Sequence, residues 1–347
     1  MLARVEEFCT RYGLRVPVLE APMAGACPPE LAVAVAEAGG MGANGVVLDR
    51  PAAIADWVAR FRAASAGPLQ LNIWVPDEPV DAPARVAAAE GFLRRFGTPG
   101  EAAGPGPVFA EQCEAMLAAE PTAVSTIMGL LDPDYVGRLH ERGIAWFATA
   151  TTLDEALAAQ EAGADAVVAQ GMEAGGHRGT FDPDAAERTT VGLIALVPRL
   201  ADHLRVPVIA AGGIADGRGV AAALALGASA VQIGTAFLRT PEAAVAPGWA
   251  ASLADLPPEG TVPTRAYSGR LGRAVATPYV TAWQEPDAPA PAPYPQHRAL
   301  VGRWRRGTTE GLDAANHWAG QSAALARAEP AGEVVARIWA QARELLA

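Results

Sequence analysis

Short apolar runs alternate along the chain with longer, alanine-rich stretches in which apolar residues recur at helical spacing. Strands of a parallel sheet are covered on both faces and read as continuous apolar runs, and helices connect them. The pattern therefore predicts repeated strand–helix units. The runs that we interpret as strands are residues 16–20, 41–43, 69–74, 123–127, 145–148, 166–169, 207–210 and 230–233.

The stretches between these runs predict helices over residues 29–38, 52–64, 133–142, 153–162, 193–204 and 217–226. Several of them are followed by a glycine, the residue that best adopts the left-handed conformation after a helix, namely Gly39, Gly143, Gly163 and Gly227. Eight parallel strands with intervening helices close most naturally into a (β/α)8 barrel of the TIM type. An open, doubly wound sheet is the alternative.

Two regions interrupt the repeat. Residues 76–107 are rich in proline and glycine, which predicts a surface excursion of the barrel near the third strand. Residues 240–327 show no clean strand–helix period and are too long for an ordinary loop. We therefore predict a barrel over residues 1–239 that includes the excursion, a smaller substrate-binding lid domain over residues 240–327, inserted after the eighth strand, and a helix over residues 328–347 that returns to the barrel.

Composition narrows the class of protein. The 347 residues are 51% hydrophobic and 19% charged, which is typical of a folded chain with a substantial core. The three cysteines stand far apart, and no metal-ligand spacing occurs, so we expect neither disulfides nor a metal site. No export signal and no run of about eighteen apolar residues is present, so we expect a cytoplasmic protein that does not span a membrane. The net charge of −11 disfavours a nucleic-acid partner. The sequence leaves the oligomeric state open.

One histidine stands out. His177 lies in the glycine-rich segment 169–180, directly after a predicted strand. Imidazole titrates near neutrality, and neighbouring glycines let backbone amides approach a ligand closely. The other histidines lie in predicted helices or in the predicted lid, so His177 is the candidate active-site base.

Barrel enzymes carry their sites at the carboxyl ends of the strands, and the residues there indicate a cofactor. The glycine loops Gly212-Gly213 and Gly234-Thr235 follow the seventh and eighth strands, where backbone amides can hold a phosphate. Asn72 and Gln170 offer the paired donors and acceptors that a flat heterocycle requires. Flavin mononucleotide (FMN) fits both ends of such a site.

At these residues the chain resembles the class I nitronate monooxygenases, also called 2-nitropropane dioxygenases, which are FMN-dependent barrel enzymes. The resemblance covers nearly the whole chain and rests on segments 21–27, 70–74, 170–179, 211–216, 231–235, 292–295 and 318–321. It implies that an alkyl nitronate, with propionate 3-nitronate as one candidate, reduces FMN by single-electron transfer. Oxygen then enters, and a carbonyl compound and nitrite leave without any pyridine nucleotide.

The resemblance also implies roles for individual residues. His177 becomes the catalytic residue, and the sequence leaves open whether it removes a proton from a neutral nitroalkane or holds the charge of a nitronate. Tyr294 and Trp318 become an aromatic wall for the substrate. The residues that we assign to FMN are Pro22, Met23, Ala24, Asn72, Gln170, Gly175, Gly176, Gly212, Gly213, Gln232, Gly234 and Thr235.

Two other functions stay open at this stage. FMN-dependent quinone reductases and enoyl-acyl carrier protein reductases share the barrel and a similar Glu-Ala-Gly-Gly-His loop, which is residues 173–177 here, but they consume NADH or NADPH. The segments around Tyr294 and Trp318 favour the monooxygenase. A barrel that only stores flavin is the third possibility, and the presence of His177 argues against it.

Overall fold

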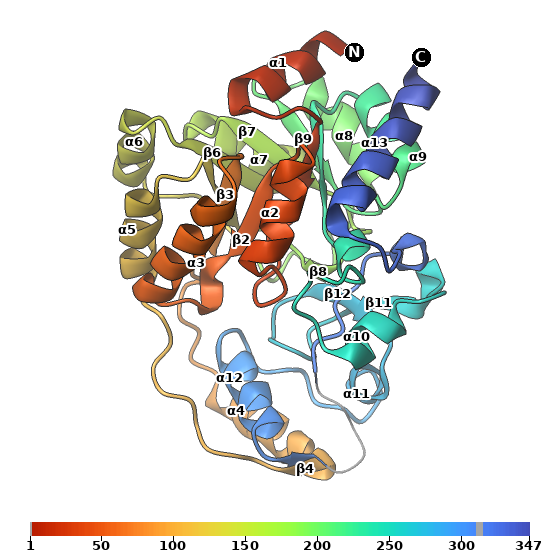
Figure 1. Cartoon of the computed structure of the whole chain (residues 1–347). Helices are drawn as coiled ribbons and strands as arrows, with labels where there is room; N and C mark the ends of the chain where they lie inside the picture. Colours follow the sequence, from red (N-terminus) through yellow and green to blue (C-terminus); the bar gives the residue numbers. More distant parts are fainter. Residues whose placement is uncertain (1, 310–314) are drawn as a thin grey trace.

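A computed structural model describes residues 2–309 and 315–347. Eight parallel strands form one sheet with the order β1-β10-β9-β7-β6-β5-β3-β2. Leu19 beside Met41 adds a parallel bridge between the two outer strands, with Glu20 N donating to Met41 O at 2.9 Å. The sheet therefore closes into the predicted barrel (Figure 1). Its strands are β1 (Val18–Glu20), β2 (Gly42–Gly45), β3 (Leu69–Trp74), β5 (Ala123–Ile127), β6 (Ala145–Ala150), β7 (Ala166–Gln170), β9 (Val208–Ala211) and β10 (Ala230–Ile233).

Helices surround the strands. Asp216 shows why one of them begins where it does, because its side chain accepts hydrogen bonds from the amides of Arg218 and Gly219. The predicted helix over 193–204 ends earlier, at Ala201, and has Pro198 in its last turn. The helices of this part are α1 (Leu2–Tyr12), α2 (Pro29–Glu37), α3 (Pro51–Ala64), α5 (Phe109–Ala119), α6 (Pro133–Glu141), α7 (Leu153–Glu161), α8 (Leu193–Ala201), α9 (Gly217–Ala225) and α13 (Ala331–Leu346).

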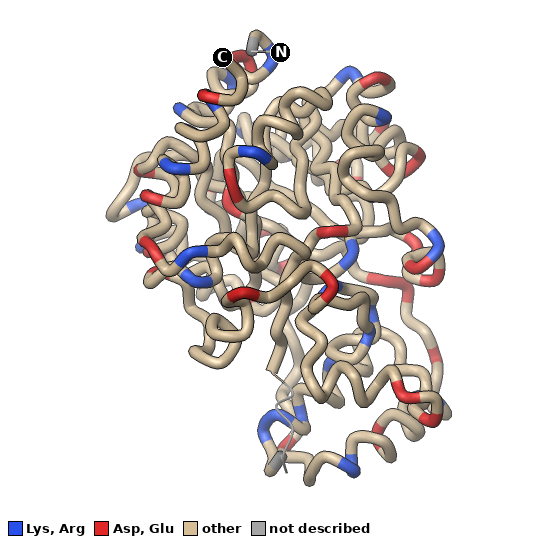
Figure 2. Tube along the Cα trace, turned by 90° about the vertical axis from the view of Figure 1, so that its right-hand side faces the viewer, with Lys and Arg blue, Asp and Glu red and all other residues tan. Residues whose placement is uncertain are grey.

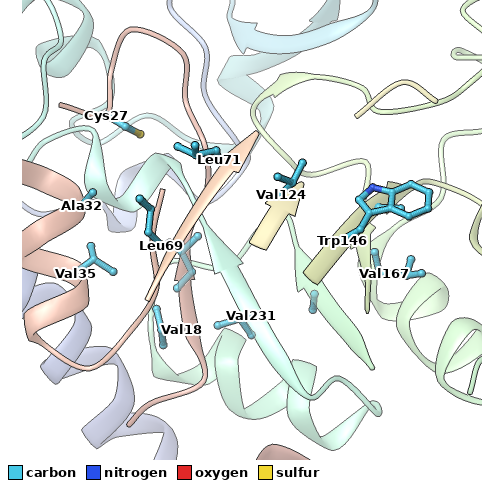
Figure 3. Close-up of a cluster of buried hydrophobic side chains, with 14 of the residues drawn as sticks. Val18, Cys27, Ala32, Val35, Leu69, Leu71, Val124, Trp146, Val167 and Val231 are labelled. Carbon is cyan, nitrogen blue, oxygen red and sulfur yellow. The ribbon is translucent and has the colours of Figure 1, made fainter. Parts of the chain in front are cut away.

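Two layers of buried side chains hold the barrel together. In the outer layer, Val18 and Leu69 face Ala32 and Val35 of α2, as Figure 3 shows. Alternate strand residues point inward, since successive side chains of a strand face opposite ways. The inner layer includes Leu19, Phe147, Val168 and Ile209, together with Phe8 and Tyr12 of α1. Because α1 packs its aromatic rings against Phe147, it covers the amino-terminal end of the barrel and leaves the carboxyl end for a ligand.

The segments outside the barrel share a second core. Phe92, Tyr279, Trp283 and Trp304 are buried together in it. Strand β4 (Gly97–Thr98) also pairs with β13 (Thr308–Thr309). The other elements of this part are α4 (Pro83–Leu93), α10 (Pro247–Ser252), β11 (Thr261–Thr264), β12 (Gly272–Val275), α11 (Pro278–Ala282) and α12 (Gln296–Arg305), with β8 (Gly176–His177) hydrogen-bonded to β12.

This packing differs from our expectation for residues 76–107. We placed them with the barrel, whereas α4 lies beside α12 and contributes Phe92 to the second core. The reason is that α4 packs against residues far along the chain, such as Phe92 against Trp283 at 4.6 Å between ring centroids, and a local sequence pattern carries no information about such contacts. Helix α13 packs against α9 and α2 of the barrel.

Charged residues do not gather by sign on the barrel helices, where acidic and basic positions are interspersed (Figure 2). None of the helices in the described part of the chain combines the length and the apolar character needed to cross a bilayer.

Candidate active site

A cavity of about 250 Å³ opens at the carboxyl ends of the barrel strands, between the barrel and the residues that follow β10. It brings together residues at or just after the ends of all eight barrel strands and residues between 267 and 322. Of the residues that the sequence predicted, the ones that line it are Pro22, Met23, Ala24, Asn72, Gln170, Gly175, Gly176, His177, Gly212, Gly213, Gln232, Gly234, Thr235 and Trp318.

Tyr294 does not line this cavity. Its ring lies 5.7 Å from the ring of Trp74, which does line it. Tyr294 therefore lies beside a residue of the cavity wall. Its predicted role in the substrate wall stays a prediction.

His177 forms part of the cavity wall and is the second residue of β8, where it pairs with Gly272. Its ring centroid lies 4.5 Å from that of Trp74 and 4.6 Å from that of Trp318. Its Nε2 atom lies 2.7 Å from Ser268 Oγ. Part of the imidazole ring is therefore accessible from the cavity. The indoles of Trp74 and Trp318 and the hydroxyl of Ser268 contact the rest of the ring.

The environment of His177 determines its charge. Burial is the largest cause that lowers its pKa, and the positive charges of Arg298 and Arg270 add to it, so that the pKa falls to about 3. At neutral pH the imidazole is therefore uncharged, and one of its ring nitrogens carries a free lone pair. A neutral imidazole in a cavity wall can accept a proton from a ligand.

Gln170 holds the loop of His177 in place. Its Oε1 accepts a hydrogen bond from Gly179 N at 2.7 Å, and its Nε2 donates to His177 O at 3.0 Å. Each end of the amide keeps a second hydrogen-bonding position, and Gln170 lines the cavity, so its predicted contact with a heterocycle stays a prediction. Nearby, the Arg178 guanidinium is buried and donates to Gln170 O and Thr189 O. Both residues fix the backbone that carries His177.

Asn72 keeps a free acceptor. Its Nδ2 donates to Ser125 Oγ at 3.1 Å, and no donor in the described part of the chain reaches its Oδ1. The side chain is buried at the end of β3 and lines the cavity. A ligand with an N–H edge can therefore bind to Asn72 from inside the barrel mouth.

The glycine loops after β9 and β10 expose backbone donors. Gly212 and Gly213 have φ angles of 117° and 68°, a region that other residues rarely adopt. Within residues 2–309 and 315–347, no hydrogen bond uses the amides of Gly212, Gly213, Gly234 or Thr235. Unpaired amides in a cavity wall are suited to an anion such as phosphate.

Residues 320–322 cross over these loops. Gly320 N donates to Thr235 Oγ1 at 3.0 Å, and Ser322 Oγ donates to Gly213 O. Both residues line the cavity. Our sequence reasoning quoted segment 318–321 without a role for Gly320 and did not include Ser322, because nothing local to these residues shows that they lie on the glycine loops.

Arg298 and Ser268 also line the cavity, and sequence reasoning gave neither of them a role. Arg298 lines the cavity and lies over the Trp74 ring, with 5.9 Å from its Cζ to the ring centroid. Among the described residues it has no carboxylate partner. A cation without a counter-ion, beside a neutral histidine, gives the cavity a positive potential that favours an anionic ligand.

Comparisons with known proteins agree with this geometry. The family model described as nitronate monooxygenase matches residues 7–341. A nitronate monooxygenase of Paraburkholderia phytofirmans is 40% identical over 94% of this chain and 92% of its own. One from Pseudomonas aeruginosa is 35% identical over 95% of this chain and 97% of its own.

Two solved structures are similar to nearly the whole chain. A nitroalkane oxidase from Streptomyces ansochromogenes is similar with a TM-score of 0.85 and 32% identity, covering 96% of this chain and 98% of that one. FabK from Thermotoga maritima is similar with a TM-score of 0.77 and 29% identity, covering 98% and 96%. The family match and the curated relatives decide between them: the chain belongs to the nitronate monooxygenase family, and it is an oxidoreductase.

Proposed function

We propose that this protein is an FMN-dependent nitronate monooxygenase, which oxidises alkyl nitronates with O2 to a carbonyl compound and nitrite. The observation that carries the proposal is the neutral His177 in the wall of a cavity that also holds the unpaired amides of the glycine loops. The wall that contains His177 is suited to the substrate. The wall formed by the glycine loops is suited to a phosphorylated cofactor.

The residues present fit FMN. The amides of Gly212, Gly213, Gly234 and Thr235 would hold its phosphate, and Asn72 Oδ1 would accept a hydrogen bond from its ring system. A Cβ at Gly212 would approach Ala174 N at 3.0 Å, so this loop has no room for larger residues. When bound, FMN supplies the electron-accepting chemistry.

The protein's own side chains handle the substrate. His177 lies between the substrate space and Ser268, where it can take a proton or contact the nitro group. Trp74 and Trp318 pack against the histidine ring and cover part of it. Arg298 adds a positive charge to the cavity, which attracts anionic substrates.

Oxygen consumption tests the proposal. The purified protein should be yellow, and it should consume O2 and release nitrite when a panel of alkyl nitronates is added. In the absence of oxygen, the nitronate should bleach the flavin, whereas NADH and NADPH should not. Rapid bleaching by NADH with no reaction on any nitronate would show a reductase like FabK instead. Bound FMN without any turnover would show a flavin carrier.

We further propose that Arg298 selects nitronates that carry a second negative charge, such as propionate 3-nitronate. Propyl-1-nitronate has an apolar methyl group in place of that carboxylate and is the matched substrate. Arg298→Gln should raise KM for propionate 3-nitronate about tenfold or more relative to propyl-1-nitronate, since a charged hydrogen bond contributes about 1.5–3 kcal/mol. Arg298→Lys, which keeps the charge, should lose less. Equal effects on both substrates would contradict this role.

A further inference from the structure

Ser268 is buried in the cavity wall, and its hydroxyl has three polar neighbours. His177 Nε2 lies 2.7 Å away. The Arg270 amide donates to Ser268 Oγ at 3.2 Å, and the Arg270 carbonyl oxygen lies 3.3 Å from it. A hydroxyl has one hydrogen to donate and two lone pairs that accept. The arrangement of these hydrogens therefore determines which nitrogen of His177 is protonated.

Only one arrangement satisfies every group. If Ser268 donates to the Arg270 carbonyl, its oxygen accepts from Arg270 N and from a hydrogen on His177 Nε2. If Ser268 donates to Nε2 instead, the Arg270 carbonyl loses its donor, and no other donor in the described chain reaches that carbonyl. Arg270 is buried, and an unpaired buried carbonyl costs about 1–3 kcal/mol. The first arrangement is therefore favoured.

We infer that Ser268 is a positioning residue that keeps the hydrogen of His177 on Nε2 and so leaves the lone pair of Nδ1 facing the cavity. No described residue offers Nδ1 a hydrogen bond, which is consistent with a nitrogen reserved for the substrate. The inference rests on the proposed function and makes its histidine a proton acceptor. A lone pair repels a preformed anion, so Nδ1 of His177 is not the atom that binds the charge of a preformed nitronate.

The proposed step moves one proton from a nitroalkane to His177 and conserves atoms and charge. The Nδ1 lone pair takes the hydrogen from the carbon that bears the nitro group, and the electron pair of that C–H bond moves onto the nitro oxygens. A nitronate and a protonated imidazole result. The Nε2 hydrogen stays bonded to Nε2 and keeps donating to Ser268 Oγ throughout, and the new Nδ1 hydrogen can then donate to a nitronate oxygen.

The loop that carries Ser268 is itself fixed. Arg270 donates through Nε to Asp77 Oδ2 at 2.8 Å, forms a second contact with Asp77 Oδ1, and donates to Thr180 O at 2.8 Å. Asp77 comes from the excursion after β3, and Thr180 comes from the loop that carries His177. One guanidinium thus joins three distant segments beside the Ser268–His177 pair.

NMR of the native holoenzyme tests the inference directly. With ¹⁵N-labelled histidine, the two ring nitrogens have different shifts according to which one carries hydrogen, and His177→Asn identifies the His177 signals among the five histidines. We expect hydrogen on Nε2 and a bare Nδ1. Hydrogen on Nδ1 would overturn the inference. This measurement needs no activity and no folded serine variant.

Serine variants provide the second test. Ser268→Ala should mix the two tautomers of His177 and lower kcat/KM on nitroethane by tenfold or more, and this loss should exceed the loss on ethylnitronate at least fivefold. Ser252→Ala is the matched control, because Ser252 Oγ lies 3.0 Å from His317 Nδ1 in another serine–histidine pair. It should change neither tautomer nor turnover.

The other possible results of these assays also test the inference or the proposed function. Equal losses of Ser268→Ala on nitroethane and ethylnitronate would indicate a structural role and overturn the inference. So would a native enzyme that oxidises ethylnitronate and never nitroethane, since a proton acceptor would then have no use. If the native enzyme oxidises neither substrate, nor any other nitronate, the proposed function fails, and the NMR result still reports the tautomer. The charged groups that act on His177 are Arg298 and Arg270.

Discussion

A histidine that stays neutral well below its usual pKa changes what pH can do to the reaction. Burial and the charges of Arg298 and Arg270 lower the pKa of His177 to about 3. Because protonation of His177 would occur only in strong acid, the imidazole can accept a proton at every pH at which the protein is normally handled. The ring is less basic in return, so its effect depends on close contact with the substrate.

The first prediction concerns this residue. We expect His177→Asn to lower kcat/KM on nitroethane by a factor of about 10²–10⁴, the range of a positioned general base. On ethylnitronate the loss should be smaller, since that substrate needs no deprotonation. The native kcat/KM on nitroethane should show no inflection from His177 between pH 5 and 8. Stopped-flow or oxygen-electrode assays measure both, and an inflection near pH 6.5 that disappears in the variant would contradict the depressed pKa.

At the scale of elements, strand β8 connects the barrel side of the cavity with the side formed by residues after β10. It carries His177 and pairs with β12, so the histidine loop of the barrel is an edge strand of the sheet formed by β11 and β12. The Asp77–Arg270 pair fastens the same region, with side-chain exposures of 14% and 2%. These contacts explain how residues after β10 can set the position of a residue after β7.

The ion pair gives the second prediction. Asp77→Asn leaves the Arg270 charge buried without its partner, which is expected to lower the free energy of unfolding by about 3–5 kcal/mol. Urea denaturation at pH 7 measures this loss. Glu114→Gln is the control, because its pair with Arg138 is exposed and should contribute less than about 1 kcal/mol. Similar losses in the two variants would show that Arg270 does not depend on Asp77.

The glycine loop after β9 gives the third prediction. Gly212→Ala places a Cβ at a φ of 117° and 3.0 Å from Ala174 N, so we expect FMN affinity to fall at least tenfold. Gly137→Ala is the matched control in α6, where a Cβ meets nothing within 4 Å. It should stabilise the protein by about 0.5–1 kcal/mol and leave FMN binding unchanged. Titration of the apoprotein with FMN, followed by flavin fluorescence, distinguishes these outcomes.

At the scale of the whole molecule, buried titratable groups set the pH range of stability. The pKa of His177 falls to about 3 and that of His297 to about 4, mainly through burial. Burial also raises the pKa of Glu20 to about 8, and no hydrogen bond from the described residues reaches its Oε1. All three groups prefer their uncharged forms in the folded chain.

The fourth prediction follows from the signs of these shifts. The histidine contributions are present above pH 6.5 and are lost as the pH falls from there toward their folded values, because the unfolded chain takes up protons first. The Glu20 contribution is present below pH 4.5 and is lost as the pH rises toward 8. These groups together place the maximum of the unfolding free energy near pH 6.5.

Glu20→Gln tests the alkaline side. The variant cannot ionise at this position, so the fall in unfolding free energy between pH 6.5 and 8, about 1–2 kcal/mol from this group, should disappear. Urea denaturation at pH 5, 6.5 and 8 measures it, and the loss between pH 6.5 and 5 should persist in the variant. An unchanged alkaline slope would show that Glu20 is ionised in the folded protein.

The sequence by itself determined the barrel, the order of its strands and the strand ends at which the site lies. Apolar runs such as residues 69–74 are local signals, and a parallel sheet forces their carboxyl ends together. The tertiary structure alone decided which residues reach those ends from elsewhere. Ser268, Arg298 and the excursion around Asp77 stand far from His177 in the chain, and no periodicity marks them. Their role depends on long-range packing, which also brings the ring of Tyr294 beside that of Trp74.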